Sequence, residues 1–203
     1  MKRIVKILSA TLLSVIFSFF YSGCGVVQQT QKATNLVNCD FRLVSAENIY
    51  LAGINISRVR SISDLGFSDA ARVMAAVAGN IFLLSFQLNI EGRNPNASPA
   101  GLNKLDWILF IDDIQMTSGT LDKAFTIPPN NGTAMIPIQI SLDLKQVLKG
   151  KSLDAITNFG FNLAGMGNKP TRIKAKLRPT IMIGGYPLTY PGYITISTEY
   201  SGS

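Results

Sequence analysis

Histidine is absent from this 203-residue sequence, and cysteine occurs only twice. Without imidazole the chain cannot form a His-based catalytic triad, and most catalytic zinc sites are excluded as well. Two cysteines are too few for the disulfide scaffold of a small secreted protein. Charged residues make up only 15% of the chain against 47% hydrophobic residues, which is the opposite of a disordered composition. We therefore expect one folded domain that is not an enzyme.

A long apolar run is missing too, and the run at the N-terminus is short. Lys2, Arg3 and Lys6 precede fourteen uncharged residues, 7–20. Fourteen helical residues reach about 21 Å, less than the roughly 30 Å hydrocarbon core of a bilayer. The pattern predicts a secretory signal peptide over residues 1–23 rather than a membrane span. Its removal would take three positive charges off the formal charge of +7.

Cys24 directly follows the small residues Ser22 and Gly23, an order that resembles the lipobox of bacterial lipoproteins. Tyr21 stands where an aliphatic residue is usual, so the motif resembles the relaxed lipoboxes of Bacteroidetes-type envelopes. The resemblance implies that Cys24 carries a thioether-linked diacylglycerol and an acyl group such as palmitate, and becomes the new N-terminus. The alternative is a secreted protein with a disulfide between Cys24 and Cys39.

Residues 24–38 are polar after the cysteine and are expected to form a tether below a domain of residues 39–203. No acidic cluster follows Cys24, whereas such a cluster often accompanies surface exposure in the resembling lipoproteins. We expect an outer-membrane lipoprotein of the bacterial envelope that faces the periplasm. Its partners would be the membrane and an envelope protein or anionic lipid, with no nucleic acid and no cofactor beyond the covalent lipid.

Strict alternation of apolar and polar residues marks half-buried strands. It is clearest in residues 82–91, 134–144 and 172–178. Further strands are predicted over residues 40–51, 54–60, 104–112, 114–120, 122–128 and 193–200. Because this pattern lacks strand–helix alternation, it predicts an all-β fold, an antiparallel β-sandwich of seven to eight strands.

Two or three short helices are expected between these strands. Ser68 is predicted to cap a helix over residues 69–78, Ser152 a second helix over 153–160, and a helical turn is expected over 145–148. Pro137 cannot donate a hydrogen bond to a ladder, so it is expected either at a sheet edge or at a position where a backbone N–H would point to solvent.

The middle of the chain carries spaced motifs of a known family. Asn94-Pro95-Asn96 follows a strand, and then come residues 105–112, Thr117-Ser118-Gly119, Ile127-Pro128 and Ile136-Pro137-Ile138. This order resembles the late embryogenesis abundant type 2 family, or WHy domain, closely over residues 81–145 and loosely over 40–200. The resemblance implies a fibronectin-III-like or immunoglobulin-like β-sandwich that binds or protects without a catalytic centre.

Within that motif, Asn94, Pro95 and Asn96 are expected to form an architectural turn. Proline fixes its own φ and restricts the preceding residue, and Asn side chains can accept bonds from nearby backbone amides. Asp112 and Asp113 are expected in a hairpin or loop rather than as an acid–base pair, because neighbouring strand residues point to opposite faces. Cys39 is expected to be a small buried hydrophobe rather than a nucleophile.

Four cations share one face of a predicted strand and form a basic row: Arg172, Lys174, Lys176 and Arg178, with Lys169 just before them. Such a row is about 20 Å long. It could contact anionic lipid headgroups, lipopolysaccharide phosphates or an acidic partner. The alternative is a solvated row that protects a sheet edge from pairing.

These observations favour a non-enzymatic, membrane-anchored envelope lipoprotein that acts as a binding, structural or stress-protective module. The alternative is a periplasmic carrier or binder of a lipid or anionic ligand. That ligand would be held between the sheets or on the basic row. The long apolar strands and the glycine-rich residues 160–167 motivate this alternative.

Overall fold

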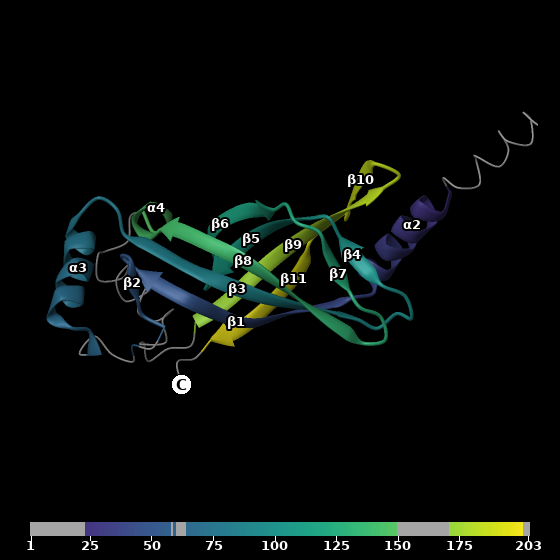
Figure 1. Cartoon of the computed structure of the whole chain (residues 1–203). Helices are drawn as coiled ribbons and strands as arrows, with labels where there is room; N and C mark the ends of the chain where they lie inside the picture. Colours follow the sequence, from purple (N-terminus) through teal and green to yellow (C-terminus); the bar gives the residue numbers. More distant parts are fainter. Residues whose placement is uncertain (1–22, 58, 60–63, 150–170, 201–203) are drawn as a thin grey trace, which may run out of the picture.

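The computed structural model describes residues 23–57, 59, 64–149 and 171–200, and it is an all-β sandwich of antiparallel sheets, as predicted (Figure 1). Three short helices accompany the strands in this part of the chain: α2 (Gly23–Val37), α3 (Phe67–Ala78) and α4 (Leu144–Val147). The predicted helix over residues 153–160 and Lys169 lie outside the described residues.

The first sheet has the strand order β2-β1-β3-β8. Its strands are β2 (Ile54–Asn55), β1 (Asp40–Leu51), β3 (Leu83–Asn94) and β8 (Gly132–Asp143). β3 and β8 pair along their whole lengths, from Leu83 opposite Asp143 to Asn94 opposite Gly132. Pro137 lies on β8 at the edge of this sheet, which confirms its predicted place.

The second sheet has the order β10-β9-β5-β6, and β11 also pairs with β9. Its strands are β5 (Lys104–Ile111), β6 (Ile114–Leu121), β9 (Thr171–Ile183), β10 (Tyr186–Thr189) and β11 (Ile194–Tyr200). β9 has β5 on one side and β10 and β11 on the other. Two short strands, β4 (Ala100–Leu102) and β7 (Phe125–Ile127), form a separate pair.

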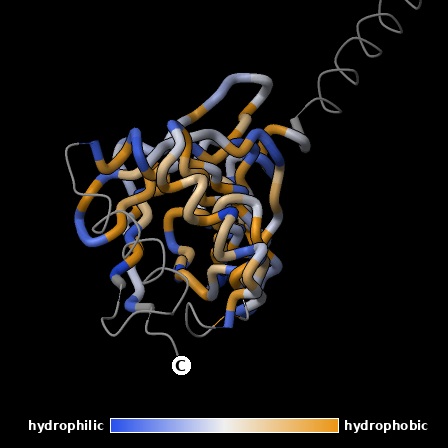
Figure 2. Tube along the Cα trace, turned by 90° about the vertical axis from the view of Figure 1, so that its left-hand side faces the viewer, coloured by the Kyte–Doolittle hydropathy of each residue, from blue (hydrophilic) through white to orange (hydrophobic). Residues whose placement is uncertain are grey.

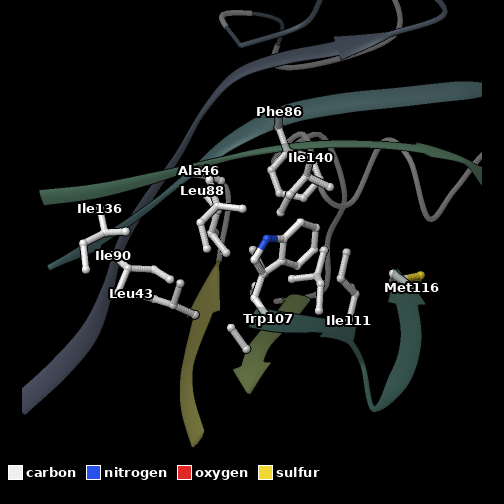
Figure 3. Packing of buried hydrophobic residues seen from close by; sticks show 14 of the residues in the cluster. Leu43, Ala46, Phe86, Leu88, Ile90, Trp107, Ile111, Met116, Ile136 and Ile140 are labelled. Carbon is white, nitrogen blue, oxygen red and sulfur yellow. The ribbon is translucent and has the colours of Figure 1, made fainter. Parts of the chain in front are cut away.

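The core fills the space between the two larger sheets (Figure 3). Trp107 of β5 lies at its centre and points toward Phe86, Leu88 and Ile140 of the opposite sheet. Alternate β5 residues are buried, as period-two patterning requires. Its other face is half-buried.

One predicted helix boundary shifts in the structure. α3 begins at Phe67 with Gly66 as its N-cap and no side-chain cap bond, so the Ser68 cap was wrong. The helix ends at Ala78 as expected, and the amide of its C-cap residue, Gly79, donates to the Ala75 carbonyl at 2.8 Å. Strands β4 and β10 were not predicted because both are short. Helix α2 was not predicted because its segment is polar by composition.

Candidate functional site

The Asn94-Pro95-Asn96 turn is a polar junction at one end of the sandwich. Asn94 is fully buried. Its Nδ2 donates to the carbonyls of Ser98 at 2.9 Å and Ile127 at 3.2 Å. Its Oδ1 accepts from the Asn96 backbone amide at 3.0 Å and from Asn96 Nδ2 at 2.7 Å. The motif therefore has an architectural role, joining the end of β3 to β7.

The same turn holds the C-terminal half of α2 against the domain. Asn96 Nδ2 also donates to the Asn35 carbonyl at 2.9 Å, and Asn35 Nδ2 donates to the carbonyls of Ser98 and Pro99, each at 3.0 Å. Asn38 Nδ2 donates to Asn96 Oδ1 at 3.2 Å. Asn35 is buried with its amide satisfied, as a buried polar side chain must be.

The segment expected to be a polar tether is largely this helix. Residues 23–37 are helical, and Ala33 and Leu36 are buried in the hydrophobic core cluster. Because the second half of α2 packs on the domain, the folded unit begins before Cys39, where the domain boundary was expected. The sequence offered a weak indication in the apolar spacing of Ala33, Leu36 and Val37, which the Gln- and Thr-rich composition obscured.

The first half of α2 lies beside the tip of the β9–β10 hairpin. Gly184, in the turn of the hairpin, donates its amide hydrogen to Gln29 Oε1 of α2 at 2.7 Å. Cys24 lies in the first turn of the same helix. Valines 26 and 27, which follow it, are exposed. Sequence reasoning missed this meeting of two segments because nothing local relates them.

An open apolar groove of about 380 Å³ separates α2 from β9 and β10. Its apolar lining comes from both sides: Ala33, Leu36 and Val37 of the helix, and Ile181, Ile183 and Leu188 of the two strands. The groove extends the inward-facing side of β9 beyond the sandwich. It is not the space between the sheets, which is filled by buried side chains such as Phe86, Leu88 and Leu109.

The basic row is ion-paired within its own sheet. Both Arg172 and Lys174 bond to Asp113 in the β5–β6 turn, and Arg178 contacts Asp106 of β5 at 3.2 Å. Lys176 lies over the ring of Phe110, with its Nζ 5.3 Å from the ring centroid. β9 is an internal strand, so the alternative that this row protects a sheet edge was wrong.

The pairing lowers the pKa of both acidic partners. A hydrogen bond from Lys174, with the nearby charge of Arg172, lowers the pKa of Asp113. A hydrogen bond from Thr120 at 2.8 Å lowers the pKa of Asp106, with further contributions from Arg178 and Lys104. The four row cations that the structure describes therefore share their face with two carboxylates.

Asp112 and Asp113 form the β5–β6 turn, with φ of 48° and 64°, as expected for a hairpin. Asp112 Oδ1 accepts from the Arg172 backbone amide at 3.0 Å, so this pair stabilises the sheet. In the described part of the chain, no group of three or more acidic or Cys side chains could hold a metal ion. Among the helices of the described residues, none is long and apolar enough to cross a membrane.

Cys39 is half-buried at the end of α2, where its Sγ lies 3.4 Å from the Asn35 carbonyl. Burial, with the neighbouring charge of Asp40, raises the pKa of this thiol to about 11. A thiol with a raised pKa carries little thiolate at neutral pH, which is the reactive form. Its placement agrees with the expected small, unreactive packing residue.

Three solved structures share low identity with the chain. The first is a protein from Archaeoglobus fulgidus, with 12% identity and a TM-score of 0.36, and the match covers 79% of this chain and 98% of that chain. The second is a putative late embryogenesis abundant (LEA) protein, with 10% identity and a TM-score of 0.38, and the match covers 97% of this chain and 89% of that chain. The third is a protein from Arabidopsis thaliana, with 10% identity and a TM-score of 0.35, and the match covers 58% of this chain and 70% of that chain. No curated protein matches the sequence. Residues 89–189, which run from β3 to the end of β10, match the family model described as late embryogenesis abundant protein.

Proposed function

We propose that this chain is a late embryogenesis abundant type 2 protein of the WHy kind that works as a bacterial envelope lipoprotein. The observation that carries the proposal is the family match over residues 89–189, which favours a stress-related, non-enzymatic protein. The same chain has a cationic, apolar leader that ends in the lipobox-like Ser22-Gly23-Cys24. Together these features support a binding or protective module attached to a membrane.

The proposed anchor is lipid on Cys24, including an acyl group such as palmitate. Each buried CH₂ contributes about 0.8 kcal/mol, so one acyl chain binds reversibly whereas two or three hold a protein stably. Cys24 lies in the first turn of α2, whose second half is bonded to the domain through Asn35 and Asn96. A lipid there would hold the domain close to the bilayer, on the periplasmic face of the outer membrane.

The domain's role would be contact with other molecules rather than catalysis. A ligand between the sheets is disfavoured because buried side chains occupy that space. Binding of an anionic ligand on the basic row is weakened because Asp113 and Asp106 already pair with three of its cations. An envelope protein that docks on the domain surface remains the favoured partner.

The anchor is tested in a bacterial host by labelling the full chain with an alkyne analogue of palmitate, then measuring the mass of the N-terminal peptide. We expect the label and an acylated N-terminal Cys24 in the outer-membrane fraction. Cys24→Ala should lose the label and leave that fraction, whereas the matched control Cys39→Ala should keep both. Label that survives in Cys24→Ala contradicts the proposal. Crosslinking of the acylated protein in its native membranes would then identify a recurrent protein partner.

A further inference from the structure

We propose that the end of the domain formed by the first half of α2 and the β9–β10 hairpin is a second membrane contact, which inserts apolar side chains into the lipid bilayer. This inference rests on the proposed anchor at Cys24, and it adds a surface that the lipobox motif does not predict. The membrane-contact surface consists of Val26, Val27, Tyr186 and Leu188. The partner is bilayer lipid.

These four side chains are exposed, although their residue types favour burial. Tyr186 is 79% exposed and Val27 is 67% exposed, and Val26 and Leu188 are exposed as well. They come from two segments that are far apart in the sequence and lie at one end of the molecule (Figure 1). The Gly184–Gln29 hydrogen bond joins the two segments, and Val26 lies beside Gly184, so the exposed apolar residues of α2 adjoin the hairpin.

The β9–β10 hairpin protrudes from the domain. Its turn, Gly184-Gly185, has φ of 58° and 85°, a left-handed conformation that glycine adopts without strain. Figure 2 shows the hairpin rising from the body of the domain. β10 ends the path of its sheet and pairs only with β9 among the described strands. Every one of its residues is exposed, so its apolar side chains face solvent in the described part of the chain.

The chemistry of the surface fits the boundary of a bilayer. Valine and leucine side chains partition into acyl chains, whereas tyrosine favours the headgroup level with its ring in the apolar zone. Leu188 also lines the groove of about 380 Å³ between α2 and the two strands, which continues from this surface. Lipid acyl chains at the membrane-contact surface could therefore also contact the apolar side chains that line the groove.

The position of Cys24 selects lipid over a protein as the occupant. Val27 lies three residues after Cys24 on the same helix, a distance of roughly 4.5 Å along the axis. A lipid on Cys24 would thus hold Val27 and the adjoining hairpin at the bilayer surface, at the depth of about 5–10 Å that interfacial segments reach. A protein partner would have to displace lipid from this end.

The test uses the acylated full chain in phosphatidylcholine vesicles with brominated acyl chains, which quench tryptophan fluorescence on contact. Tyr186→Trp places a reporter on the membrane-contact surface, and Leu188→Trp gives a second one. Phe67→Trp is the matched control, because Phe67 is 93% exposed on α3 at the opposite end of the molecule. Trp107 is buried in the core and contributes the same background to all three variants.

We expect brominated lipid to lower the added fluorescence of Tyr186→Trp and Leu188→Trp about twofold, with a blue shift, at an interfacial depth. Phe67→Trp should be unchanged. Equal behaviour of all three variants in protein with acylated Cys24 would overturn the membrane contact and leave the proposed anchor standing. Absence of acylation by mass analysis of the same sample would instead contradict the proposed function.

Discussion

At the scale of single residues, the amide of Asn94 organises the junction between the sandwich and α2. Both of its polar atoms are used, and the side chain is fully buried. Asn96, in the same turn, donates a hydrogen bond from its Nδ2 to the Asn35 carbonyl of α2. A buried amide with all its partners fixes one geometry, since any displacement leaves polar atoms without bonds in an apolar environment.

Asn94→Ala should lower the free energy of unfolding by about 3 kcal/mol, because the Ile127 carbonyl and the Asn96 amide lose their partner while buried or partly buried. Denaturant unfolding followed by the fluorescence of Trp107 measures this change. The control is Gln146→Ala, which removes an exposed amide on α4 and should change stability by less than about 0.5 kcal/mol. Equal effects of the two substitutions would show that the junction is not a stabilising element.

At the scale of secondary-structure elements, β5 and β9 pair by charge as well as by backbone. Asp106 of β5 stands opposite Arg178 of β9 and also accepts from Thr120 of β6. Three neighbouring strands are thus linked on the outer face of the sheet. The alternation of residues 172–178 predicted this strand, but the acidic partners come from β5 and from the β5–β6 turn.

Asp106→Asn should reduce stability by about 1 kcal/mol at pH 7, and the deficit should disappear in acid. The pKa of Asp106 is lowered in the folded state, first by Thr120 and then by Arg178. A lowered carboxyl pKa contributes stability above the unfolded value of about 3.9, and this contribution is lost as the pH falls through the folded value.

Urea unfolding of both proteins between pH 7 and pH 2.5 measures this dependence. The wild type and Asp106→Asn should converge below pH ~4. Asp122→Asn, which removes an exposed carboxyl group from the loop after β6, should show no such convergence. A constant difference between wild type and Asp106→Asn at every pH would contradict the assigned interaction.

At the scale of the whole molecule, α2 connects the chain at Cys24 to the β-sandwich. The helix meets the domain at two places, the Asn35–Asn96 junction near its C-terminus and the Gln29–Gly184 bond near its middle. The groove lies between α2 and the strands β9 and β10. The orientation of the domain relative to a membrane would therefore be set by α2 rather than by a flexible linker.

Asn35→Ala should loosen this coupling without unfolding the sandwich, since it removes two hydrogen bonds to the Ser98 and Pro99 carbonyls. Hydrogen exchange of α2 amides should become about tenfold faster, while β3 and β8 amides keep their protection. Thr34→Ala, which changes an exposed neighbour on the same helix, should leave α2 exchange nearly unchanged. Uniformly faster exchange across the sheets would mean that α2 is part of the cooperative core.

The sequence by itself determined the fold class and most strands, because alternation is a local property of neighbouring residues. Residues 82–91, 134–144 and 172–178 correspond to β3, β8 and β9, and Pro137 marked a sheet edge correctly. The turn at Asn94-Pro95-Asn96 was equally local. Strands as short as β4 and β10 contain too few residues for a period to be detected.

Only the tertiary structure decided which distant residues meet. It brought Asp113 and Asp106 onto the basic row, which changed a stripe of cations into a set of ion pairs. It also placed the β9–β10 hairpin beside the first half of α2 and turned a polar segment into a docked helix. These contacts join residues separated by tens of positions, and their formation depends on strand order and packing rather than on any local pattern.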